Sequence, residues 1–120
     1  MVNPANNLNS LTEREVTDLF LGRYVAFPDG SAALPLDQPL KSEIRKHFYE
    51  NLTGKSVRQI NAYWAKLVFS GRATPPRSAR RSDDITSMIN NNLNAIAYMD
   101  SEDVTDEVKV ILLIPHKGTE

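Results

Sequence analysis

Apolar residues recur every three or four positions in four stretches of the chain, and each stretch follows a residue that can cap a helix. The first follows Thr12, and Glu15 three residues later completes a capping box. Gly22 provides the stop, so we predict a helix between Thr12 and Gly22. Its inward positions are Val16, Leu19 and Phe20.

Two further helices are predicted in direct succession. Ser42 can cap a helix over Glu43–Thr53, and Ser56 with Gln59 forms the capping box of a helix that runs to about Phe69. The inward positions of the first are Ile44, Phe48 and Leu52. Those of the second are Val57, Ile60, Trp64, Leu67 and Val68. Trp64 lies among apolar residues of its helix, which favours a core role over ligand stacking.

A fourth helix begins after Ser82, where Asp83 and Asp84 suit the helix dipole, and its inward positions are Ile85, Met88 and Ile89. Short strands are predicted at 95–99 and 108–114. The second run is apolar on both faces, which predicts an inner strand covered on both sides by helices. Residues 23–27 and 31–36 flank a Pro-Asp-Gly turn and predict a short hairpin, in which Pro35 lies at a strand end or sheet edge.

Helices that separate short strands predict an α/β fold, a small three-layer sandwich. At 120 residues we expect a single domain, 1–120, with a polar lead-in over about 1–10 and a basic loop over about 72–81.

Composition narrows the function. A net charge of −1 argues against nucleic acid as a partner, and the chain lacks an apolar run of the ~20 residues that membrane insertion requires. Zero cysteines exclude disulfides and thiol catalysis. His47 and His116 lack a second ligand at metal spacing, so we expect no metal. Without a nucleophile–base pair, a phosphate loop or paired carboxylates, we expect neither an enzyme nor a cofactor.

Several segments, in order, resemble periplasmic phosphate-binding proteins of ABC transporters, which are type 2 periplasmic binding proteins. They are residues 11–23 (LTEREVTDLFLGR), 27–30 (FPDG) and 94–99 (NAIAYM), together with 2–4 (VNP) and 63–76 (YWAKLVFSGRATPP), which are similar to short, single-lobe relatives. The resemblance implies a fold like one lobe of such a protein, whose ligand cleft is closed by two lobes around a hinge. It also implies export to the periplasm after removal of a signal peptide, whereas composition alone leaves a cytoplasmic location open.

The resemblance places the family's phosphate-holding segment, Arg-Ser-x-Gly-Ser-Gly-Thr at a helix N-terminus, at residues 37–43 (DQPLKSE). This stretch has no glycine and a single hydroxyl, and Pro39 lacks a backbone donor. Ala97 stands where the family has glycine. We therefore expect no tight phosphate binding by the isolated chain.

Two groups of residues remain candidates for binding. The predicted helix start could hold phosphate or another oxyanion through Lys41, Ser42 and Arg45, or it could be an ordinary capped helix. The basic loop could grip an anion or an acidic partner, or be a solvated charge run, through Arg72, Arg77, Arg80 and Arg81.

Two hypotheses follow. The first is a non-enzymatic, phosphate-binding-like accessory or sensory protein of the periplasm. The second is a structural or interaction module that has lost ligand binding and uses the lobe face for a protein partner or for a homodimer. Convergent donors in a concave site would support the first, and an exposed apolar face the second.

Overall fold

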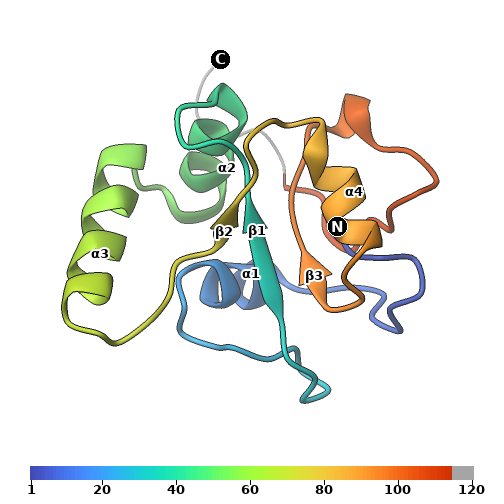
Figure 1. Cartoon of the computed structure of the whole chain (residues 1–120), viewed down its shortest axis with the longest axis horizontal. Helices are drawn as coiled ribbons and strands as arrows, with labels where there is room; N and C mark the ends of the chain where they lie inside the picture. The colour runs from blue at the N-terminus through green and yellow to red at the C-terminus, as the bar shows by residue number, and fades with distance from the viewer. Residues whose placement is uncertain (115–120) are drawn as a thin grey trace.

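A computed structural model describes residues 1–114 and confirms the predicted α/β class. His116 lies outside these residues. Figure 1 shows the elements in the order α1 (Glu13–Phe20), β1 (Leu34–Asp37), α2 (Glu43–Thr53), α3 (Val57–Phe69), β2 (Arg77–Ser78), α4 (Asp84–Asn90), β3 (Ala95–Ile96) and a 3-10 turn, η1 (Ser101–Asp103). All four predicted helices are present.

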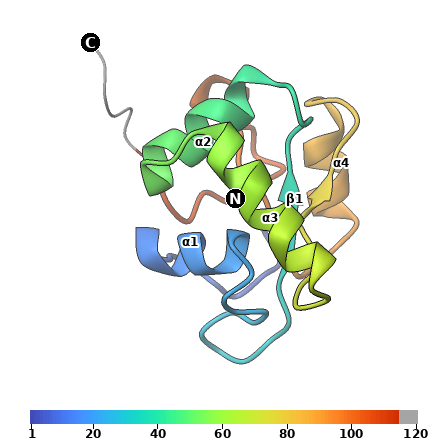
Figure 2. The same cartoon turned by 90° about the vertical axis from the view of Figure 1, so that its left-hand side faces the viewer.

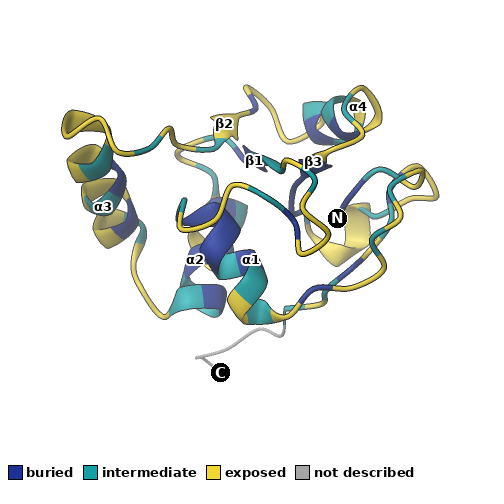
Figure 3. Cartoon of the chain, turned by 90° about the horizontal axis from the view of Figure 1, so that it is seen from below, coloured by how far each residue is buried: buried dark blue, intermediate teal, exposed yellow. Residues whose placement is uncertain are grey.

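The three strands form a small parallel sheet in the order β2-β1-β3, with Leu36 opposite Arg77 and Leu34 opposite Ala95. The sheet separates α4 on one face from α1 and α2 on the other, which gives the predicted three layers (Figure 3). Helix α3 lies at the edge of the molecule beyond α2 (Figure 1) and is in front of the sheet when seen from that side (Figure 2).

Local sequence explains where three of the helices begin. Thr12 and Ser56 each accept a bond from the backbone of the third helical residue, whose Glu15 or Gln59 side chain bonds back, so both predicted capping boxes are formed. Ser42 caps α2 by accepting a bond from the Arg45 backbone amide, without a side-chain bond in return. The cap of α4 is Asp83, which makes no side-chain capping bond.

The buried apolar residues form two clusters, one on each face of the sheet. The larger lies under α1, α2 and α3 and contains a parallel stack of Phe48 and Tyr98, with ring centroids 3.6 Å apart, crossed by the edge of Phe20. The smaller lies under α4 and contains Leu36, Ala79, Ile85, Ile89, Ala95, Ala97 and Val108. Trp64 is buried in the larger cluster, as predicted, whereas Val68 is 48% exposed and its predicted inward position is wrong.

The α3 helix approaches the turn after α1 closely. Tyr63 donates its hydroxyl to the Leu21 carbonyl at 2.6 Å, and the Trp64 ring covers Gly22. Gly22 has φ +73°, and a Cβ there would lie 2.7 Å from Trp64 Cη2. Both the backbone conformation and the close approach require glycine.

The prediction of an inner strand at 108–114 is wrong. Only Lys109 pairs, in an isolated antiparallel bridge with Val2, which bridges Ile96 as well. Val2 and Lys109 exchange both backbone bonds, at 2.9 and 2.8 Å. Leu113 is 71% exposed, so residues 108–114 are not covered on both sides. The apolar composition of this run predicts two covered faces, which the structure does not have.

The strand containing Pro35 lies at the centre of the sheet, which corrects its predicted edge or end position. Leu34 donates its amide to Asn94 on the β3 side at 2.9 Å, so by alternation the Pro35 nitrogen faces the β2 side. Since β2 pairs only with Leu36 and Asp37, no partner there needs a donor from Pro35. The predicted loop at 72–81 contains β2, and the predicted hairpin is reduced to one bridge between Ala26 and Ala32.

Candidate functional site

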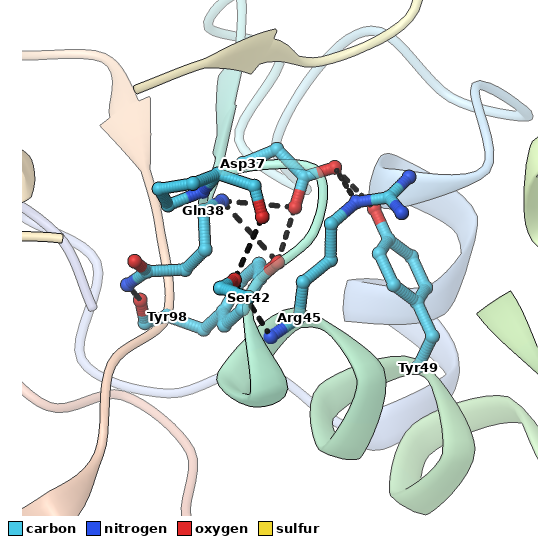
Figure 4. Close-up of polar contacts among 7 residues, drawn as sticks. Asp37, Gln38, Ser42, Arg45, Tyr49 and Tyr98 are labelled. Carbon is cyan, nitrogen blue, oxygen red and sulfur yellow. Dashed lines mark hydrogen bonds and ion pairs between the residues drawn. The ribbon is translucent and has the colours of Figure 1, made fainter. Parts of the chain in front are cut away.

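A cluster of buried polar side chains lies at the carboxyl end of β1, where the chain turns into α2. In open α/β sheets this end of the strands is where ligands bind. The cluster consists of Asp37, Gln38, Arg45, Tyr49 and Tyr98, and Figure 4 shows it beside Ser42. We call these five residues the Asp37 cluster.

The Asp37 carboxylate is the centre of the cluster. Its Oδ2 accepts from Arg45 Nε at 3.1 Å and from the Tyr49 hydroxyl at 3.0 Å. Its Oδ1 accepts from the Tyr98 hydroxyl and from the backbone N–H of Gln38, the latter at 3.0 Å. The side chains of Asp37 and Arg45 are 3% and 4% exposed, so this ion pair is fully inside the protein. Buried charges are tolerated when paired and hydrogen-bonded in this way.

Both tyrosines of the cluster are locked as donors. Burial raises the pKa of Tyr49 and of Tyr98 above the ordinary phenol value, and the negative charge of Asp37 raises both pKa values further. The Arg45 guanidinium, 5.2 Å from the Tyr49 ring centroid, partly opposes the rise in the pKa of Tyr49. The two hydroxyls therefore remain protonated throughout the physiological pH range.

Two polar atoms of the cluster are buried without a hydrogen-bond partner among residues 1–114: Gln38 Oε1 and Arg45 Nη1. The orientation of the Gln38 amide is fixed, because its Nε2 donates to the Tyr98 carbonyl at 2.7 Å and only the nitrogen can pair with a carbonyl. Gln38 therefore turns an unused acceptor away from Tyr98.

The structure places the three predicted anion ligands in different environments. Ser42 donates its hydroxyl to the Pro39 carbonyl at 2.7 Å while capping α2, so its proton already has an acceptor. Lys41 is exposed beside it. Arg45 turns inward to Asp37 and not outward to join Lys41. Thus Lys41 and the first amides of α2 are left to face an external anion.

Sequence reasoning did not identify the centre of the cluster, Asp37, or its two tyrosine donors. The available pattern was a carboxylate that directly follows an apolar run, with Arg45 and Tyr49 four residues apart on the next helix. Such a pair shares one helix face. It could have indicated an internal ion pair.

A cavity of about 350 Å³ lies next to the Asp37 cluster. It is bounded by Gln38, the first turns of α4 and the segment that leads into η1, and its lining residues are Gln38, Ile44, Ser82, Asp83, Thr86, Met99, Asp100 and Asp103. We call it the acidic cavity. A second cavity of about 520 Å³ is mostly apolar and lies between α1, α2 and residues 111–114.

The four arginines of the basic loop are all exposed and are spread along the segment from the end of α3, through β2, to the start of α4 (Figure 1). Arg77 lies in β2 itself, and Arg81 pairs with Asp83 at 3.2 Å in an exposed contact. Arg72 and Arg80 lie on either side of β2. They form a basic strip and not a closed anion site.

Two kinds of site are absent from the described part of the chain. No group of three or more His, Asp or Glu side chains there could hold a metal ion. None of the helices within residues 1–114 is long and apolar enough to cross a membrane.

The fold is similar to that of a solved structure. It superimposes on a protein from Clostridium perfringens described as a phosphate ABC transporter substrate-binding protein, solved by X-ray crystallography with bound phosphate, with a TM-score of 0.71 and 19% sequence identity. The match covers 92% of this chain but 42% of that one, so the chain spans less than half the length of the solved structure. At this identity the likeness establishes the fold alone, which matches a single lobe of a periplasmic binding protein. No family model and no curated protein sequence matches the chain.

Proposed function

We propose that the chain is a non-enzymatic lobe of the periplasmic solute-binding type, acting as a binding or sensory accessory outside the cytoplasm. The observation that carries this proposal is the structural match, which spans nearly the whole chain and less than half of the phosphate-binding protein. The buried polar cluster lies at the carboxyl end of the strands, the usual ligand-binding end of such a sheet.

Free phosphate is not expected to bind tightly. Residues 37–43, which the resemblance aligns with the phosphate-holding segment, contain an anion of their own, Asp37. The Asp37 carboxylate already pairs with Arg45 and accepts bonds from both tyrosine hydroxyls. Of the residues in 1–114, an incoming phosphate would meet Lys41 and the amides at the start of α2, which are weak without further donors. Any role in handling an oxyanion would then require a second lobe or partner that contributes the remaining donors.

Calorimetry with phosphate at low salt tests this part of the proposal. We expect a dissociation constant weaker than about 1 mM, unchanged in Ser42→Ala because the Ser42 hydroxyl is committed to Pro39. Ser56→Ala, which removes the matching cap from α3, controls for the loss of helix stability. Micromolar binding that is lost in Ser42→Ala but kept in Ser56→Ala would show that the α2 start is an anion site after all.

A second candidate function, an interaction module, is favoured by a specific observation. Phe69 at the end of α3 is 95% exposed, and Val25 near the end of α1 is 77% exposed. Exposed apolar side chains mark a surface that meets another protein or a second copy of the chain when they form a contiguous patch, so these two residues are where we would test for one. The basic loop could steer an acidic partner toward this side of the molecule.

Sedimentation over a concentration series and capture from a periplasmic extract distinguish the two functions. Association or capture that is reduced in Phe69→Ser would support the interaction module. Replacing all four arginines of the loop with serine should slow partner capture if the loop steers encounter. A strict monomer that captures no protein would leave the solute-binding lobe as the better account, whereas capture that the arginine replacements leave unchanged would keep the partner but remove the loop from its binding.

A further inference from the structure

We propose that the acidic cavity binds an organic ammonium group, carried on a short alkyl chain. The cavity has the dimensions of a small-molecule site, at about 350 Å³, and it lies between three separate parts of the chain. Its residues differ from those of the proposed anion contacts at Lys41 and Ser42. The inference therefore does not depend on whether the lobe binds an oxyanion.

The first observation is the unused acceptor of Gln38. This side chain is 1% exposed, it lines the cavity, and its Oε1 has no partner among the described residues. Because Nε2 is held by the Tyr98 carbonyl, the amide cannot rotate to offer a donor instead. A buried acceptor without a donor is costly to the protein, and an N–H group that reaches Oε1 from the cavity would remove that cost.

The second observation is the charge and polarity of the lining. Three aspartates are among the lining residues, Asp83, Asp100 and Asp103, all of them exposed to solvent, and no lysine or arginine is among the described lining residues. The positive charge of Arg81, 3.2 Å from Asp83 in an exposed contact, partly neutralises the charge of Asp83. The negative charges of Asp100 and Asp103 therefore dominate the lining. This field attracts a cation and repels an anion.

The remaining lining residues select the kind of cation. Two hydroxyl residues at the start of α4, Ser82 and Thr86, and two apolar residues, Ile44 and Met99, are also among the lining residues. An ammonium group has three donors and no acceptor, which matches the amide, hydroxyl and carboxylate oxygens, and its alkyl chain suits the apolar residues. A metal ion is a poorer match, because the described residues contain no group of three metal-binding side chains.

Titration of the whole chain with 1,4-diaminobutane, followed by calorimetry and by amide NMR shifts, tests the proposal. We expect saturable binding with the largest shifts at Gln38 and in the 99–103 segment. The double variant Asp100→Asn/Asp103→Asn should weaken binding about fivefold or more, since each neutralised carboxylate contributes modestly at a partly exposed site. Asparagine still caps η1 at position 100, so the variant keeps its fold.

The matched control is Asp106→Asn/Glu107→Gln, which removes the same charge from exposed positions of the same acidic segment that do not line the cavity. It should leave affinity within about twofold of the starting chain. Equal weakening by both double variants would show general charge screening and overturn the proposal. Equal binding of 1,4-butanediol, which has the same length without charge, would overturn it as well, as would the absence of saturable shifts.

A second probe distinguishes two sources of the ammonium group, a lysine of a partner protein and a free amine solute. N-acetyl-lysine amide presents the lysine side chain as a partner protein would, without a free α-amine. Binding as tight as that of the diamine, with the same dependence on Asp100 and Asp103, assigns the cavity to a lysine of a partner. Preference for the diamine by about tenfold assigns it to a free amine solute.

Discussion

Replacing Asp37 with asparagine removes one charge from the protein and almost no volume. The Arg45 guanidinium, 4% exposed, would then be buried without a counter-ion. The carboxylate accepts four bonds, and the NH₂ group of asparagine would point a donor at some of the donors that make them. Removing one partner of a buried pair typically costs about 3–5 kcal/mol. Because whole domains are stable by about 5–15 kcal/mol, Asp37→Asn should bring the chain close to unfolding.

A double-mutant cycle isolates the ion pair from the rest of the cluster. Arg45→Met keeps the length of the side chain and removes the charge, while Asp37 retains the Tyr49, Tyr98 and Gln38 donors. The double variant Asp37→Asn/Arg45→Met leaves no buried charge behind. It should therefore be destabilised by about 2 kcal/mol less than the sum of the two single variants.

Urea denaturation, followed by far-UV circular dichroism and by Trp64 fluorescence, measures these free energies of unfolding. Asp18→Asn is the matched control. Asp18 Oδ1 lies 3.2 Å from Arg23 Nη1, a similar ion-pair distance, but the Arg23 side chain is 55% exposed. That change should cost at most about 1 kcal/mol after solvent screening. A loss below about 1 kcal/mol for Asp37→Asn, or strict additivity in the cycle, would refute the view that Asp37 neutralises Arg45 internally.

The remaining predictions concern packing, backbone, pH and association. Trp64→Ala should cost about 3–5 kcal/mol in urea denaturation, and a loss below about 1 would show that this ring is not core. Gly22→Ala should cost more than about 1 kcal/mol, since φ is +73° and its Cβ would lie 2.7 Å from the Trp64 ring, whereas neutrality would refute the close approach. Because their pKa values are raised, Tyr49 and Tyr98 keep their protons when tyrosines of the unfolded chain ionise, so stability should fall as pH rises above about 10. The slope should be up to about 1.4 kcal/mol per pH unit for each phenol, and an unchanged slope in Tyr49→Phe would contradict this assignment. Phe69→Ser should reduce any self-association seen by sedimentation without lowering stability, because the side chain is 95% exposed.

The helical half of the fold could be predicted from the sequence because its information is local. Each capping residue and its partner are three positions apart, and the apolar spacing within each helix shows which face is buried. The one misplaced inward position, Val68, lies in the last turn of α3, where the core has already ended.

Strand segments at 31–36 and 95–99 were predictable, but the order of the strands in the sheet and the Asp37 cluster were not, because each depends on residues far apart in the chain. β1 is central only because β2 and β3, which are two residues each, come to lie beside it. Tyr98 is 61 positions from the Asp37 carboxylate to which it donates. No periodicity indicates such a pairing, and Pro35 argued for the opposite position because its missing donor was the only local information.

The position of Val2 has a consequence for the order in which the parts of the protein fold. Val2 is fully buried and joins Ile96 to Lys109, so a residue near the beginning of the chain completes its pairing only with residues near the end. The helices can form from local residues alone, but this closure must wait until Lys109 is available. Such long-range closure slows folding, and until it is complete the unfilled place of Val2 leaves apolar surface open, to which chaperones can bind.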